Sequence, residues 1–206
     1  EGPSLKSIEE QATWISDVID SVGMTKASLV GHSQGSLITM ECAAQFPNKI
    51  KSLSLMGGAG AIPMNPELLD LAEKGDVKAV DLMMDWAHGP AGHFGGHSVP
   101  GLHHINIGRT IIHNGSVKDA LGIDFRACDN YKNGFEAAKK IQCPTINILG
   151  NEDRMCPVKE GKKLADCITG SQVEIIPNCG HMILLEEADQ ALAILKKFIT
   201  INHPSN

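Results

Sequence analysis

The sequence predicts an α/β fold built on a mostly parallel sheet that is flanked by helices. Two blocks of the chain alternate between short apolar runs, typical of buried strands, and amphipathic runs at helical spacing. Strand, helix and strand joined by short links imply parallel strands with right-handed crossovers. Between the blocks this alternation stops, which predicts a helical insertion. We therefore divide the chain into a first core part at 1–60, a helical cap or lid at 61–140 and a second core part at 141–206.

The first block opens with an amphipathic helix over residues 7–22. Ser7 is its expected N-cap, with Glu10 three residues later as capping-box partner, and Gly23 is a natural stop. The block then continues with a strand, a helix and a second strand at residues 27–30, 35–45 and 50–56.

The middle of the chain reads as helices without strands. Two short helices are expected within 66–86, separated near Gly75, and further helical pieces at 105–114, 117–121 and 128–139. Residues 87–102 are rich in Gly, His and Pro and show no periodicity. The second block then predicts strands at 145–149 and 172–176, with helices at 158–168 and 187–201.

Composition excludes several classes of function. The chain has 206 residues, a net charge of −6 and a pI near 5.8, which argue against a nucleic-acid or anionic-membrane surface. No apolar run approaches the roughly 18–20 residues of a membrane span. The six cysteines are scattered without a CxxC pair, which favours free thiols in a reducing cytosol. We therefore expect a cytoplasmic protein without nucleic-acid or membrane partners.

The first chemical motif is G-x-S-x-G at residues 31–35, between a predicted strand and a predicted helix. A serine hydroxyl becomes an effective nucleophile when a tight turn exposes it and a base removes its proton. We expect Ser33 to be that nucleophile, with Gly31 and Gly35 at positions where a Cβ would crowd the turn. The backbone amide of Gln34 is the expected oxyanion donor at the start of the helix.

Two further polar residues follow predicted strands at the same edge of the sheet. Asp153 lies in a turn after the strand at 145–149, and His181 lies between the last strand and the last helix. Sites of α/β sheets form at the carboxyl ends of the strands. The expected roles are His181 as base and Asp153 as the acid that orients it, with Glu152 as the alternative acid.

These motifs together resemble the α/β-hydrolase superfamily, in its capped serine-hydrolase branch. G-H-S-Q-G at 31–35 is similar to the nucleophile elbow, and G-N-E-D-R-M-C-P at 150–157 to the acid turn. C-G-H-M at 179–182, followed by Glu186 and Glu187, is similar to the histidine loop. The family fold has strands before the nucleophile strand and a loop that gives a second oxyanion donor. Neither precedes Ser33 here, so we expect only the C-terminal strands in this chain and the N-terminal segment as a partner of the same fold.

The resemblance implies a serine hydrolase that cleaves a carboxylic ester of a small-molecule acyl substrate, without a metal or organic cofactor. C–C bond hydrolases, thioesterases, lactonases and aminopeptidases of the proline-iminopeptidase kind share the triad and remain alternatives. A non-catalytic binding protein of this fold is a second class, although its usual mark, a broken triad, is absent. Neither the oligomeric state nor the identity of the substrate follows from the sequence.

Substrate-binding candidates follow from their place beside the motifs or in the cap. They are His32, Met83, Trp86, Phe94 and Met182, and packing roles are a competing interpretation for them. Six histidines also fall in the cap, and loop or pocket-lining roles are favoured over a metal site because no Cys or carboxylate lies at ligand spacing. They are His88, His93, His97, His103, His104 and His113.

Overall fold

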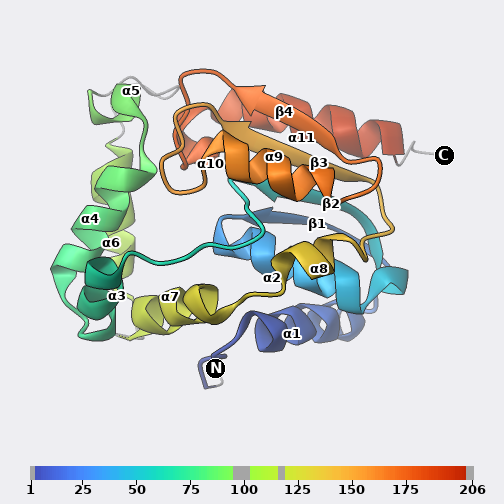
Figure 1. Cartoon of the computed structure of the whole chain (residues 1–206), viewed down its shortest axis with the longest axis horizontal. Helices are drawn as coiled ribbons and strands as arrows, with labels where there is room; N and C mark the ends of the chain where they lie inside the picture. Colours follow the sequence, from blue (N-terminus) through green and yellow to red (C-terminus); the bar gives the residue numbers. More distant parts are fainter. Residues whose placement is uncertain (1–2, 95–102, 116–118, 203–206) are drawn as a thin grey trace.

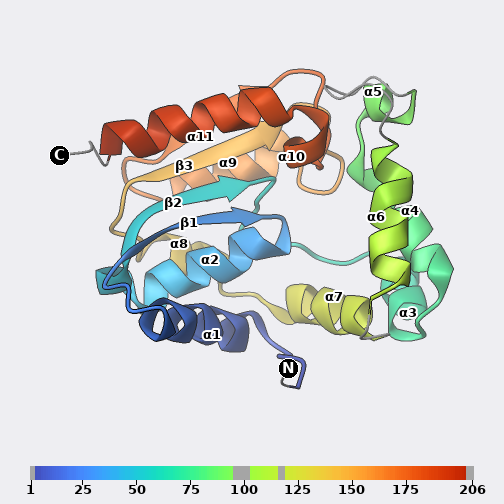
Figure 2. The same ribbon diagram turned by 180° about the vertical axis from the view of Figure 1, so that it is seen from behind.

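The computed structural model describes residues 3–94, 103–115 and 119–202. Four strands form one parallel sheet in the order β1-β2-β3-β4, which confirms the predicted α/β class. The strands are β1 (Ala27–His32), β2 (Ile50–Met56), β3 (Thr145–Gly150) and β4 (Gln172–Ile176). In Figures 1 and 2 all four point toward the same end of the molecule.

Helices cover both faces of the sheet (Figures 1 and 2). On one face, side chains of α1 (Ile8–Ser21), α2 (Gln34–Gln45) and α9 (Val158–Asp166) share a buried cluster with β2. On the other face, α11 (Ala188–Asn202) packs on β3 and β4 together with the short α10 (Ile183–Glu186). Burial of these apolar faces is the main favourable term in folding.

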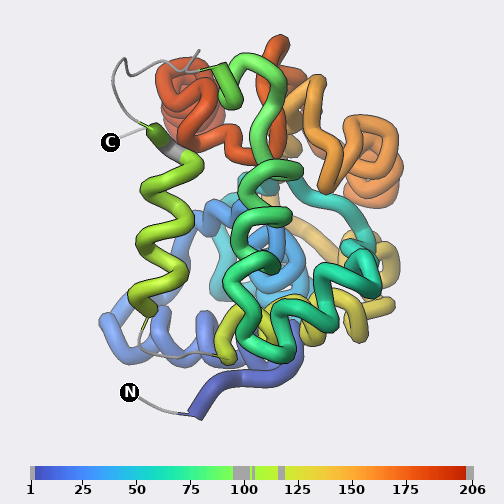
Figure 3. Tube along the Cα trace, turned by 90° about the vertical axis from the view of Figure 1, so that its left-hand side faces the viewer, coloured from blue at the N-terminus to red at the C-terminus, as the bar shows by residue number. Residues whose placement is uncertain are grey.

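The cap helices stand beyond the carboxyl ends of the strands (Figures 1 and 3). They are α3 (Pro66–Glu73), α4 (Val77–Ala87), α5 (Pro90–His93), α6 (His104–His113) and α7 (Ala120–Asn130). They have small apolar cores of their own: Leu68 and Leu69 pack with Phe125, and Met84 packs with Ile105. The described part of residues 61–140 contains no strand. Nor is any described helix both long and apolar enough to cross a lipid bilayer.

The helix boundaries at the end of the cap differ from the prediction. Instead of helices at 117–121 and 128–139, α7 is followed by a break and then by α8 (Gly134–Ala138). Residues 116–118 lie outside the described part. Gly134 explains the break, because a Cβ there would lie 1.9 Å from the backbone oxygen of Gly60. The chain turns to make this close approach, which local periodicity does not encode.

Two smaller details also differ. Helix α10 has only four residues, too few to show a helical period. At the start of α1, Ser7 Oγ accepts from Glu10 N–H as expected, but the Glu10 carboxylate accepts from Lys6 N–H rather than from Ser7.

Candidate active site

Three hydrogen bonds join the loops that follow β1, β2 and β3. The N–H of Ser33 donates to the Met56 oxygen at 3.0 Å, and that of Gly57 donates to the Ile148 oxygen at 2.9 Å. The N–H of Asn151 donates to the Ile176 oxygen at 3.0 Å. Each bond links the residue after one strand to a backbone oxygen of the next strand, and Glu152 N–H donates to the Cys179 oxygen in the histidine loop at 2.9 Å. The loops that carry the candidate residues are therefore fixed side by side.

Ser33 occupies a sharp turn between β1 and α2. Its φ of 55° lies in the left-handed region, which is unusual for a residue with a side chain. A Cβ on Gly31 would lie 2.2 Å from the Gly35 oxygen and 2.4 Å from Thr39 Oγ1, so the expected crowding is confirmed there. The same expectation for Gly35 is wrong, since a Cβ at Gly35 would meet nothing within 4 Å. Gly35 already lies in the first turn of α2.

The amide expected to stabilise an oxyanion belongs to Gln34, the first residue of α2. Backbone N–H groups in the first turn of a helix have no acceptor within that helix. The helix dipole also favours negative charge at this end. The Gln34 N–H is therefore available beside the Ser33 side chain.

Asp153 and His181 form a buried pair. His181 Nδ1 lies 2.8 Å from Asp153 Oδ2, and the two residues are 3% and 6% exposed. The other carboxylate oxygen accepts from the N–H groups of Met155 and Cys156, each at 2.8 Å. An ionised carboxylate only accepts, so Nδ1–H of the imidazole donates and Nε2 is the nitrogen left to accept a proton. Asp153, and not the alternative Glu152, contacts the imidazole.

The loop that carries His181 is attached to the cap. The His181 N–H donates to the oxygen of Ala87, the last residue of α4, at 2.8 Å. The buried carboxylate of Glu186 accepts from Gly89 N–H at 2.8 Å and from Gly180 N–H at 3.2 Å. The sequence names Glu186 only through its resemblance, and its contact with the cap appears only in the structure.

Gly57 is a neighbour of this pair that the sequence does not reveal as part of the site. It has a φ of +53°, and a Cβ there would lie 3.1 Å from His181 Nδ1 and 3.4 Å from Asp153 Oδ2. The sequence did offer one signal for Gly57, which is its position directly after the strand predicted at 50–56. Glycine at this point leaves room for the imidazole and the carboxylate to meet.

His32 supports the same loop from the other side. Its Nε2 lies 2.7 Å from the backbone oxygen of His181, and the two imidazole rings are 4.9 Å apart. Burial, and then the charge that His181 can carry, lowers the pKa of His32 from 6.5 to about 4. His32 is therefore neutral at physiological pH, and its Nε2–H donates to the His181 oxygen.

Ser33, Gln34 and His181 line one cavity of about 530 Å³. Its walls are mostly apolar and come from both core and cap. His32, Met83 and Met182 also line it, as expected of substrate-binding residues. These dimensions and this lining suit a small-molecule ligand with a hydrocarbon part.

Two of the expected substrate-binding residues do not line this cavity. Helix α4 presents Met83, Met84 and Ala87 to the cavity, which leaves Trp86 on another side of the helix. Phe94 follows α5 and is 90% exposed. The prediction for Trp86 and Phe94 is therefore wrong for the Ser33 cavity. Their positions in the sequence place both residues in the cap, but the direction of each side chain depends on how the cap helices pack.

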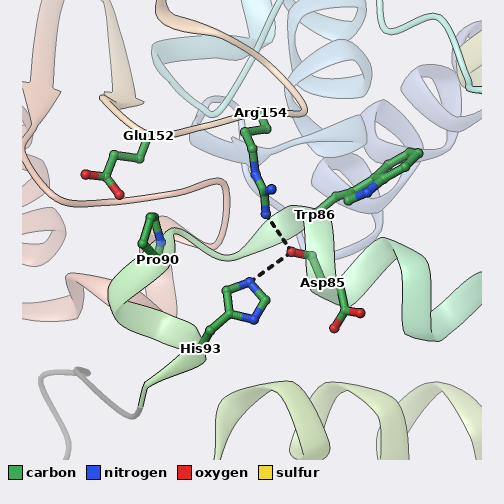
Figure 4. Close-up of a pocket in the computed structure, with 6 residues that line it drawn as sticks. All are labelled: Asp85, Trp86, Pro90, His93, Glu152 and Arg154. Atoms are coloured by element: carbon green, nitrogen blue, oxygen red, sulfur yellow. Dashed lines mark hydrogen bonds between the residues drawn. The ribbon is translucent and has the colours of Figure 1, made fainter.

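Trp86 borders a second hollow between the cap and the acid turn (Figure 4). Glu152 lines this hollow. Arg154 Nη2 donates to the backbone oxygen of Asp85 at 2.8 Å. His93 Nε2 also lies 3.1 Å from that oxygen. Figure 4 shows both contacts converging on Asp85. The acid turn, like the histidine loop, is thus hydrogen-bonded to the cap.

Two of the remaining histidines have contacts within the structure. His88 Nδ1 lies 2.9 Å from the Met84 oxygen, and His103 Nδ1 accepts from Asn106 N–H at the start of α6. His97 lies outside the described residues, among which no group of three or more His, Cys, Asp or Glu could hold a metal ion. All six cysteines are free, and burial raises the pKa of the Cys179 thiol to about 12, so this thiol beside His181 stays protonated.

The model of the α/β hydrolase fold family matches residues 4–188, which is most of the chain. The chain belongs to the α/β hydrolase fold family. This confirms the resemblance that the three motifs indicate, and the four-stranded parallel sheet with flanking helices belongs to that fold.

Relatives of the chain carry several names. A monoacylglycerol lipase of Xenopus laevis is 29% identical over 94% of this chain and 61% of its own length. A 2-hydroxymuconate semialdehyde hydrolase of Pseudomonas sp. (strain CF600) is 24% identical over 88% of this chain and 65% of its own length. The chain therefore spans about three fifths of the lipase that it matches.

Solved structures agree with the fold. A thermophilic esterase superposes with a TM-score of 0.82 at 26% identity, over 98% of this chain and 77% of the esterase. The enol-lactonase of Burkholderia xenovorans LB400 superposes with a TM-score of 0.84 at 21% identity, over 97% of this chain and 76% of the lactonase. The second likeness concerns the fold alone.

The turn at Ser33 makes a paired prediction for Gly31 and Gly35. Gly31→Ala should lower the free energy of unfolding by on the order of 2 kcal/mol, because its Cβ would overlap backbone. Gly35→Ala should be neutral or stabilising by up to about 1 kcal/mol, because alanine favours the helix. Urea denaturation of both variants measures this, and equal losses would contradict the assignment of the tight contact to Gly31.

His32 predicts how stability depends on pH. Unfolding allows its imidazole to bind a proton that the folded site excludes, so unfolding becomes more favourable as pH falls from 6.5 toward 4. Wild type should lose up to about 1.4 kcal/mol per pH unit more than His32→Gln in that window. Denaturant titrations at pH 7, 6 and 5 give the comparison. Parallel pH dependence of the two proteins would show that His32 is not held neutral.

Proposed function

We propose that this protein is a serine hydrolase that cleaves carboxylic esters through an acyl-enzyme intermediate. The observation that carries the proposal is the shared cavity: Ser33, in its left-handed turn, lines the same space as His181, which is hydrogen-bonded to the buried Asp153. A nucleophile, a base and an orienting acid around one apolar space are the parts that acyl transfer needs.

In this mechanism Ser33 Oγ attacks the ester carbonyl while His181 Nε2 accepts its proton. Asp153 holds the imidazole through Nδ1–H and stabilises its charged form. The Gln34 N–H donates to the developing oxyanion. His181 then gives the proton to the leaving alcohol. Water attacks the acyl-enzyme with His181 again as base, which regenerates the Ser33 hydroxyl and releases the carboxylic acid.

Ester cleavage is favoured over the alternative reactions on this triad. Two relatives that resemble the chain are named as a monoacylglycerol lipase and an esterase. An aminopeptidase would need a cluster of carboxylates to bind the substrate amine, but Asp81 and Asp85 are paired with Arg109, and Asp124 is the one carboxylate among the described residues that line the cavity. A small-molecule acyl ester therefore remains the substrate that we propose, and a cytoplasmic location remains a prediction.

Ser33→Ala tests the nucleophile. Hydrolysis of p-nitrophenyl esters of increasing chain length should fall by at least about a thousandfold. Wild type should be labelled at Ser33 by a fluorophosphonate probe, and the variant should not. Circular dichroism confirms that both proteins are folded. Hydrolysis that survives in the variant would refute the mechanism, and a folded wild type with neither hydrolysis nor labelling would favour a binding role.

Asp153→Asn and Glu152→Gln form a matched pair that tests the acid. Asp153→Asn should lower kcat by about a thousandfold or more, because an amide cannot stabilise the imidazolium and favours the wrong tautomer. Glu152→Gln removes a carboxylate from the neighbouring residue without touching the imidazole and should change kcat little. Steady-state kinetics on one p-nitrophenyl ester measure kcat for both variants. A larger loss of kcat in Glu152→Gln would assign the role of the acid to Glu152.

A further inference from the structure

Asp124, on α7, places a carboxylate in the wall of the Ser33 cavity. It is the only carboxylate among the described residues that line the cavity, and no lysine or arginine is among them. The surrounding wall is apolar, with Met64, Leu121 and Phe125 next to it. Charge in an apolar wall is costly unless a partner is present. Packing of apolar side chains therefore does not explain why a carboxylate lies at this position.

Two glutamine side chains hold Asp124 in place. Asp124 Oδ1 accepts from Gln11 Nε2 at 3.3 Å and from Gln34 Nε2 at 3.2 Å. Gln34 Nε2 also lies 3.1 Å from Gln11 Oε1. The three residues come from α7 of the cap and from α1 and α2 of the core (Figures 1 and 2). Because Gln34 directly follows Ser33, this network links the carboxylate to the turn that carries the nucleophile.

The second oxygen of Asp124 has no such contact. No hydrogen bond from the described residues reaches Oδ2, and the residue is half-buried. Two other cap carboxylates differ: Asp81 pairs with Arg109 at 2.7 Å, and Asp129 accepts from Met64 N–H at 3.1 Å. Asp124 combines a fixed position, a place in the cavity wall and an oxygen still able to accept.

We propose that Asp124 determines specificity by accepting a hydrogen bond, through Oδ2, from a hydroxyl group on the alcohol part of the ester. This inference rests on the proposed ester hydrolysis. The apolar wall of the cap, including Met83, Ile107 and Ile111, takes the acyl chain, so the polar position beside Gln34 is left for the alcohol part. The substrate class is then a monoester of an alcohol that carries a further hydroxyl.

A hydroxyl fits this site better than an ammonium group. A hydroxyl has one hydrogen to donate and needs one acceptor, whereas an ammonium group has three and carries a charge that must be desolvated. Asp124 already shares its charge with two amide donors, and the described lining holds no second carboxylate. One free acceptor oxygen therefore matches one hydroxyl.

Three octanoate esters test the proposal with the purified protein: 2-hydroxyethyl, ethyl and 2-aminoethyl octanoate. Wild type should show a kcat/KM for the hydroxyethyl ester roughly tenfold above that for the ethyl ester, the value of one hydrogen bond to a charged group. Asp124→Leu removes the acceptor at similar size and should abolish the ratio. In Asp124→Asn the one oxygen stays with the Gln11 and Gln34 donors and an NH2 group replaces Oδ2, so this variant of nearly unchanged shape should also lower the ratio. Thermal unfolding reports whether each variant is folded.

The outcomes separate this inference from the proposed function. Equal kcat/KM for the hydroxyethyl and ethyl esters in wild type, or an unchanged ratio in Asp124→Leu, would overturn the role of Asp124 while leaving ester hydrolysis intact. A wild-type preference for the aminoethyl ester that both variants lose would assign an ammonium group instead. If wild type cleaves none of the three esters, the proposed function fails and this inference fails with it. Should Asp124→Leu not fold, the wild-type ratio and Asp124→Asn decide.

Discussion

The structure depends on parallel strands whose carboxyl ends share one edge and whose hydrogen-bonding continues beyond the strands. Ser33, Gly57 and Asn151 each donate their N–H to a backbone oxygen of the next strand. A connection between parallel strands leaves the edge where the strands end and returns to the opposite edge, where the next strand begins. Every loop at the carboxyl edge therefore directly follows a strand. Backbone hydrogen bonds thereby position a serine, a carboxylate and an imidazole that are far apart in the chain.

The cap is bound to the loops that carry Asp153 and His181 by backbone contacts as well as by side chains. Ala87 accepts from the N–H of His181, and Glu186 joins Gly89 to the histidine loop. Arg154 attaches the acid turn to the end of α4 (Figure 4). The same contacts therefore hold two parts of the site: the cap wall that would face an acyl chain, and the imidazole that would move the proton. A change in the position of α4 would be transmitted to His181.

Polar groups are distributed unevenly around the cavity. Asp153 and His181 are buried as a hydrogen-bonded pair, and His32 is kept neutral by burial while it donates to the His181 oxygen. A neutral neighbour avoids a second positive charge beside the imidazole that must accept a proton. Asp124 is the exception, with its charge facing an otherwise apolar wall. In the proposed mechanism, Asp153 and His181 would serve the reaction, whereas Asp124 would select the substrate.

The sequence by itself determined the α/β class, the strand order along the chain and the three residues Ser33, Asp153 and His181. These depend on local patterns: apolar runs that end at a turn, and motifs of a few residues. Tertiary structure alone decided which side chains share the cavity. It excluded Trp86, and it brought Asp124 to Gln11, 113 residues away. Helix packing sets the direction of each side chain, and no local pattern records a contact between distant segments.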